Sequence, residues 1–133
     1  MTPSLKATVF AACALLPLAT LSAGVEQRRE VVPVGHPNNP ETWYLLAESL
    51  SEQSKDSTLT PDGAKALVLR SLEATEQALK LNPVYYNALN LKAALLRQRA
   101  ISEKDPSVRK KLIAEAEVVS RKAAEIAERR EKV

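Results

Sequence analysis

An internal repeat constrains the fold of this chain more than any other feature. Residues 37–83 and 83–127 share the same order of prolines and apolar positions, so each is interpreted as one helix–loop–helix hairpin. The apolar stripe that begins at Trp43 in the first copy begins again at Leu89, 46 residues later. Self-similarity at such a period is typical of helical arrays, in which each hairpin buries its apolar face against the next. The repeat therefore predicts stacked hairpins.

Four helices are expected, two in each copy, because apolar residues recur there in steps of three and four. The expected helices span residues 40–53, 61–81, 84–101 and 106–130. Three of them begin with a proline that follows a capping residue: Asn39-Pro40, Thr60-Pro61 and Asp105-Pro106. The chain has only three glycines, and no segment shows the alternation of a half-buried strand. The sequence thus predicts an all-α fold of two antiparallel helix–turn–helix hairpins, stacked as a short α-solenoid.

The second and fourth expected helices carry the most informative apolar faces. Small residues at Ser71, Ala74 and Ala78 would let a neighbouring helix approach the second helix closely. The fourth helix has an apolar stripe with nearly coiled-coil spacing, formed by Val108, Leu112, Ala116, Val119, Ala123 and Ile126. Two interpretations of the fourth helix remain open. It caps the array, or a second subunit completes its stripe.

The aromatic residues are expected to play different roles. Trp43 lies on the apolar stripe of the first helix, so it is expected in the core. Tyr85 and Tyr86 are adjacent, and adjacent residues in a helix point about 100° apart. One of these tyrosines should therefore be partly exposed, where a ring with a hydroxyl group makes a good contact residue.

Residues 1–23 have the features of an export signal. Lys6 ends a short basic segment, residues 7–21 form an apolar stretch, and small residues before Gly24 offer a cleavage site. The alternative is an uncleaved membrane anchor, although an apolar stretch of fifteen residues is short beside the roughly 20 that span a bilayer. Cleavage would make the protein periplasmic or secreted. The expected organisation is a signal at 1–23, an extended lead-in at 24–36 and a helical domain at 37–133.

The only cysteine, Cys13, lies inside the apolar stretch of the signal. Lipoprotein processing would use such a cysteine, but Phe10 stands where a lipobox has leucine. We therefore interpret Cys13 as a small apolar residue of the signal. After cleavage the chain would contain no cysteine and hence no disulfide.

The residues give little support to catalysis or to nucleic-acid binding. His36 is the only histidine, and the chain lacks a glycine-rich phosphate loop or a metal-ligand motif. Glu115 and Glu117 cannot act as a pair, because two-residue spacing points them about 200° apart on a helix. Removing residues 1–23 lowers the net charge from +3 to +2, and the basic run 109–111 is soon followed by these glutamates. We expect no enzymatic activity, cofactor, metal or nucleic-acid partner.

Two segments of the first copy, residues 37–50 (PNNPETWYLLAESL) and 78–83 (ALKLNP), resemble the tetratricopeptide repeat family. Trp43, Leu46, Ala47 and Leu50 resemble the aromatic, leucine, small and large positions of the first helix of that family's repeat. Ala78 and Pro83 resemble the alanine and the proline that close its second helix. The resemblance implies helical hairpins that hold other proteins.

The second copy departs from that family in two respects. Leu89, Ala93 and Leu96 match, but Lys92 stands where a leucine-type residue is expected, and no proline closes the last helix. The period is also about eleven residues longer than the usual 34. These departures leave open an elongated variant or a different helical-repeat family.

In the resembling family, the first helices of successive repeats line a groove that binds a peptide. When the positions of that groove are matched to this sequence, the residues that would line it are Tyr44, Glu48, Ser51, Asn87, Asn90, Ala94 and Arg97. Asparagine side chains suit hydrogen bonds to an extended peptide backbone, and Arg97 could pair with a carboxylate. A solvated polar face explains the same residues without a ligand, and both interpretations stay open.

The sequence therefore predicts an exported, non-enzymatic scaffold or adaptor that binds a protein or peptide partner. One alternative is a membrane-anchored assembly subunit of an envelope complex, which requires that residues 1–23 are retained. Another is a structural helical homo-oligomer that pairs through the apolar stripe of the fourth helix.

Overall fold

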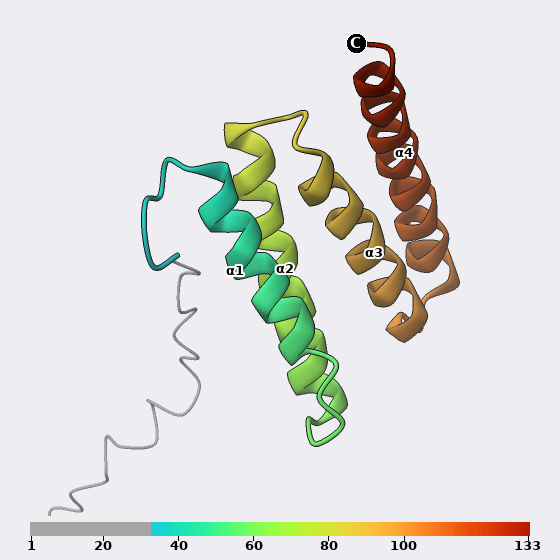
Figure 1. Ribbon diagram of the computed structural model, residues 1–133. Helices are drawn as coiled ribbons and strands as arrows, with labels where there is room; N and C mark the ends of the chain where they lie inside the picture. The colour runs from blue at the N-terminus through green and yellow to red at the C-terminus, as the bar shows by residue number, and fades with distance from the viewer. Residues whose placement is uncertain (1–32) are drawn as a thin grey trace, which may run out of the picture. The chain divides into compact units, whose positions relative to one another are not determined.

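The computed structural model describes residues 33–133, which form four α-helices and no strand within that range (Figure 1). The helices are α1 (Pro40–Gln53), α2 (Pro61–Leu81), α3 (Tyr86–Ser102) and α4 (Pro106–Glu131). α1 packs antiparallel to α2, α3 packs antiparallel to α4, and α2 and α3 join the two pairs. The prediction of an all-α fold in two antiparallel hairpins is confirmed. The expectations about the export signal and Cys13 concern residues outside the described range.

The three predicted helix caps form as expected. The side chains of Asn39, Thr60 and Asp105 each accept a hydrogen bond from a backbone N–H of the following turn, at 3.0, 3.1 and 2.8 Å. α3 begins at Tyr86, two residues later than predicted. The chain first makes a turn after Asn82, whose carbonyl accepts the N–H of the residue before α3 at 3.1 Å.

The small residues of α2 allow α1 to pack closely. Ser71, Ala74 and Ala78 are completely buried, which confirms their predicted role. The Ser71 hydroxyl donates a hydrogen bond of 2.6 Å to the backbone carbonyl of Ala47 in α1. A larger side chain at these positions would push the two helices apart, because protein interiors are close-packed.

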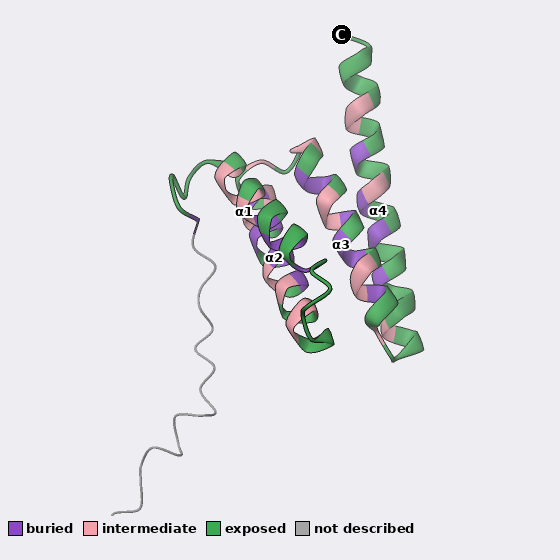
Figure 2. Ribbon diagram, turned by 60° about the horizontal axis from the view of Figure 1, so that its bottom comes forward, coloured by how far each residue is buried: buried purple, intermediate pink, exposed green. Residues whose placement is uncertain are grey.

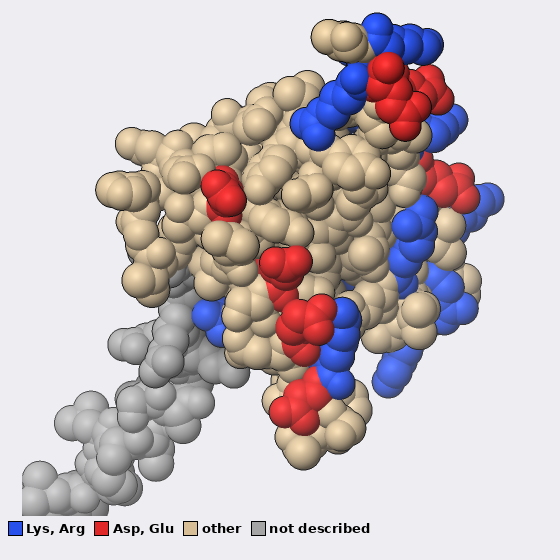
Figure 3. All heavy atoms as spheres, in the orientation of Figure 1, with Lys and Arg blue, Asp and Glu red and all other residues tan. Residues whose placement is uncertain are grey.

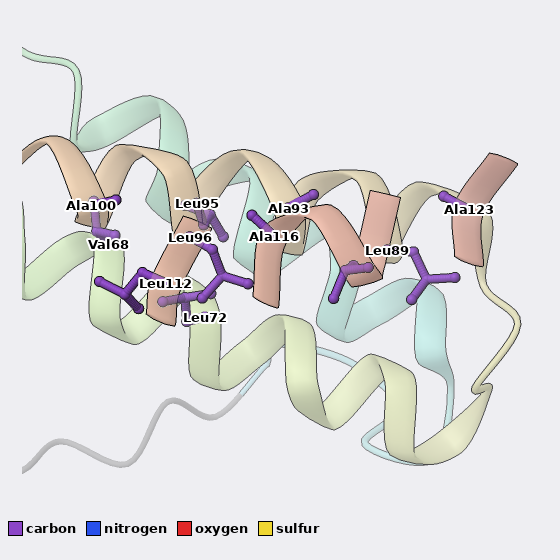
Figure 4. Close-up of a cluster of buried hydrophobic side chains, with 11 residues drawn as sticks. Val68, Leu72, Leu89, Ala93, Leu95, Leu96, Ala100, Leu112, Ala116 and Ala123 are labelled. Atoms are coloured by element: carbon purple, nitrogen blue, oxygen red, sulfur yellow. The ribbon is translucent and has the colours of Figure 1, made fainter. Parts of the chain in front are cut away.

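One apolar cluster joins α2, α3 and α4 (Figure 4). Its larger members come from all three helices and include Val68, Leu72, Leu89, Leu95, Leu96, Leu112 and Val119. α4 packs mainly against α3, and the middle of its apolar stripe, from Leu112 to Ala123, is buried (Figure 2). The middle of the stripe is therefore covered within the chain, whereas Val108 and Ile126 at its ends are only partly buried.

The described end of the lead-in is attached to α1. Pro33 is buried, and Gly35 takes a φ of +135° beside Thr42. The indole N–H of Trp43 donates a hydrogen bond of 2.7 Å to the carbonyl of Pro37. Trp43 is only partly buried, so the prediction that it lies in the core is wrong. It lies instead between α1 and this segment.

Candidate partner-binding face

α1 and α3 lie next to each other, and both pack on α2 (Figure 1). We call their exposed side the α1/α3 face and define it by Glu41, Tyr44, Leu45, Glu48, Asn87, Asn90, Ala94 and Arg97. Of the residues expected in a binding groove, five are exposed: Glu48, Asn87, Asn90, Ala94 and Arg97. Tyr44 is partly buried. The spacing of the apolar stripe accounts for this exposure, because the opposite sides of both helices are packed.

Ser51 differs from the other expected residues, because it is only 5% exposed. It lies within a polar junction between α1 and α3. The Ser54 hydroxyl donates to the Ser51 carbonyl at 2.6 Å and accepts from the Gln98 amide at 3.3 Å. Ser51 therefore supports the packing of the two helices and has little surface for a partner, so its expected place on the face is corrected.

An aromatic pair links α1 to the start of α3. The rings of Tyr44 and Tyr85 lie 5.4 Å apart with an angle of 60° between their planes. The Tyr44 hydroxyl donates a hydrogen bond of 3.1 Å to the Glu48 carboxylate. Burial, the bond to Glu48 and its charge raise the pKa of Tyr44. Burial and the charges of Glu41 and Glu48 raise the pKa of Tyr85.

Acidic residues gather on the α1 part of the face (Figure 3). Glu41 and Glu48 are two helical turns apart, so they project from the same side of α1. Neither carboxylate forms an ion pair within residues 33–133, whereas Glu52 pairs with Lys55 at 2.6 Å. The face therefore carries two carboxylates whose charge no described cation neutralises.

The α3 part of the face is polar without being acidic. The side chains of Asn87 and Asn90 make no hydrogen bond to another described residue. Arg97 donates from Nη2 to the Ser120 hydroxyl of α4 at 2.8 Å. Arg97 is thus tied to α4, which reduces its freedom to reach the partner carboxylate that the sequence suggested.

Charge is distributed unevenly along the array. Residues 33–60 contain four acidic side chains and one basic side chain, whereas residues 106–133 contain eight basic and five acidic ones. Figure 3 shows the same contrast, with acidic side chains over α1 and basic ones along α4. The two ends of the array therefore differ in the sign of their charge.

Lys92 explains one departure from the tetratricopeptide pattern. Its ammonium group lies 3.5 Å from Glu76 of α2 and 3.3 Å from Glu115 of α4. The Lys92 side chain is 18% exposed, so its apolar stem is buried while its charge joins three helices. The lysine replaces an apolar contact by an ion-pair network.

The part of the chain that the structure describes does not meet the requirements of a three-ligand metal site or of a membrane-spanning helix. No group of three histidine, cysteine, aspartate or glutamate side chains there could hold a metal ion. No helix there is long and apolar enough to cross a membrane.

Comparison with known proteins gives no relative for this chain. No protein-family model, no curated protein and no solved structure matches it.

Proposed function

We propose that this protein is a non-enzymatic interaction scaffold that binds a protein or peptide partner through the α1/α3 face. The polar and charged groups that this face leaves available carry the proposal. Within residues 33–133, Asn87 and Asn90 offer amides without hydrogen-bond partners, and Glu41 and Glu48 offer carboxylates that form no ion pair, although Glu48 accepts a hydrogen bond from Tyr44. Their supporting backbone is two packed helices, so a partner would meet groups that are already ordered.

The rest of the proposal rests on the sequence. Residues 1–23 would act as an export signal, so the scaffold would work in the periplasm or outside the cell. The order of apolar residues, small residues and prolines in each hairpin supports a tetratricopeptide-like helical repeat. If the signal is retained, the same face would serve a membrane-anchored assembly subunit.

The first test separates binding from folding. The full-length protein, carrying a C-terminal affinity tag, is expressed in its source cells and its partners are captured from the exported fraction. We expect the double variant Asn87→Ala/Asn90→Ala to keep its melting temperature, because both side chains are exposed, and to lose most of the captured partner. The matched control is Glu73→Ala/Lys80→Ala on the exposed side of α2. Equal capture by the two variants would contradict the proposal, and unfolding of the asparagine variant would show that its side chains are structural.

A further inference from the structure

We propose that the α1/α3 face binds an extended, positively charged segment of the partner. A lysine or arginine side chain of that segment would lie against Tyr44 and Tyr85, between Glu41 and Glu48. This inference rests on the proposed function and adds the chemistry of the partner. It starts from charge complementarity, because the acidic side chains of this face have no cation of their own within the described residues.

The carboxylates determine the sign of the partner's charge. Glu41 and Glu48 project from one side of α1 and lack an ion pair among residues 33–133. An acidic segment would meet these two charges without a compensating group on α1. Arg97, the exposed cation of the α3 part, keeps its charge, but its bond to Ser120 holds it toward α4 and away from the α1 carboxylates. A cationic segment is therefore favoured over an acidic one on this face.

The tyrosine pair offers a place for the cationic side chain itself. Lysine and arginine side chains bind over aromatic faces within about 6 Å of the ring centroid. Tyr44 and Tyr85 form a tilted pair, and both residues are only partly buried. The Tyr44 hydroxyl bonds to the Glu48 carboxylate at 3.1 Å, so one carboxylate lies at the edge of the pair. Burial, followed by the charges of Glu41 and Glu48, raises the pKa of Tyr85. Ring faces and carboxylates together are what an arginine or lysine requires.

The remaining exposed residues fit the backbone of an extended segment. The amides of Asn87 and Asn90 each offer a donor and an acceptor, which matches the alternating groups of a peptide backbone. Leu45 is 54% exposed and lies between Glu41 and Glu48 in the sequence, on the same side of α1. It gives an apolar contact for a residue beside the cation.

A random dodecapeptide library displayed on phage is the probe for this inference. The full chain is used for selection at physiological salt, which screens the weak long-range attraction between exposed charges. The same selection is run on Glu41→Gln/Glu48→Gln, which keeps a hydrogen-bond acceptor for Tyr44. The charge-matched control is Glu128→Gln/Glu131→Gln in the exposed last turns of α4. Circular dichroism melts confirm that all three proteins fold.

We expect the unmodified chain and the control to enrich peptides that contain lysine or arginine. The Glu41→Gln/Glu48→Gln variant should lose this enrichment and bind a selected peptide about tenfold more weakly, a fold-change typical of losing charge-assisted contacts. Enrichment of acidic or neutral peptides, or cationic peptides that bind both variants equally, would overturn the charge assignment and leave the scaffold proposal standing. No enrichment on any protein, together with unchanged partner capture by the asparagine variant, would overturn both.

Discussion

Trp43 and Tyr44 are neighbours in α1, yet they stabilise different contacts. Trp43 points to the lead-in, where its indole N–H bonds to Pro37, and Tyr44 points to Tyr85 at the start of α3. Adjacent helical residues diverge by about 100°, so one short helix contacts two other parts of the chain. At the scale of single residues, α1 is held by both an aromatic pair and a side-chain bond to the backbone.

Substitution of Trp43 separates ring packing from the hydrogen bond. We expect Trp43→Ala to lower the free energy of unfolding by about 2–3 kcal/mol, below the 3–5 kcal/mol of a fully buried aromatic residue, because Trp43 is only partly buried. Trp43→Phe should cost about 1 kcal/mol, since it keeps most of the ring contact and loses the bond to Pro37. Urea unfolding followed by circular dichroism measures both. Equal costs for the two variants would show that the hydrogen bond outweighs packing.

The raised pKa values of Tyr44 and Tyr85 predict a loss of stability in alkali. The neutral phenol is favoured in the folded chain, so this contribution is fully present below about pH 10, the ordinary tyrosine pKa. It is lost as the pH rises through the folded-state pKa. We expect the melting temperature to fall above pH 10 and to fall less in Tyr44→Phe/Tyr85→Phe. Parallel declines in the two proteins would mean that other groups cause the loss.

At the scale of helices, α3 determines the arrangement of the array because it contacts the other three. Its apolar residues join the cluster shared with α2 and α4, and Lys92 pairs with a glutamate from each of these helices. Since both glutamates are about half exposed, the pairs add little stability individually. The buried stem of the lysine contributes packing as well as charge.

Substitution at Lys92 tests this description. We expect Lys92→Met to change the free energy of unfolding by no more than about 0.5 kcal/mol, because an apolar side chain of similar length keeps the packing. Lys92→Glu should cost about 1–2 kcal/mol, since it places a third carboxylate beside Glu76 and Glu115. The charge-reversed variant Lys92→Glu/Glu76→Lys should recover part of this loss. Thermal melts at low and high salt compare the variants, and a Lys92→Glu protein as stable as the unmodified chain would disprove the network.

The helices themselves were predictable because their signals are local. Asn39, Thr60 and Asp105 mark three helix starts through capping chemistry that depends only on neighbouring residues. The exposure of Asn87 and Asn90 also follows from local spacing, since the apolar stripe fixes the opposite side of α3. Ser51 and Tyr85 were not predictable in this way. The burial of Ser51 depends on the approach of α3, and Tyr85 reaches Tyr44 from outside a helix.

At the scale of the whole molecule, the two ends of the array differ because equivalent positions of the repeat carry different residues. The second helices of the two copies begin 45 residues apart, at Pro61 and Pro106, so Leu72 of α2 corresponds to Glu117 of α4. Leu72 is buried in the cluster shared with α3 and α4, whereas Glu117 is exposed. With the 46-residue offset, the buried Ser51 corresponds to the exposed Arg97. Charged residues therefore cover the surface on which a third hairpin would stack, as in the capping repeats of solenoids.

Removal of the charges at Glu117 and Arg97 should allow another chain to stack on this end of the array. We expect the double variant Glu117→Leu/Arg97→Ser to self-associate, because its end surface then resembles the one that α3 covers in the first hairpin. Sedimentation equilibrium should show a mass that rises with concentration, and the unmodified chain should remain at its single-chain mass. The control is Lys122→Leu/Arg97→Ser, which adds leucine at a different exposed position of α4. A single-chain mass for the first variant would show that this end is not a stacking surface.

Site-specific photo-crosslinking in the source cells would show whether the α1/α3 face contacts a partner. A photoreactive phenylalanine derivative replaces Asn90 or Ala94 on the face, or Glu73 or Lys80 on the exposed side of α2. We expect a crosslinked product of discrete mass from the first two positions and none from the other two. Crosslinks from the α2 positions alone, or with equal yield from all four, would contradict the proposed binding face.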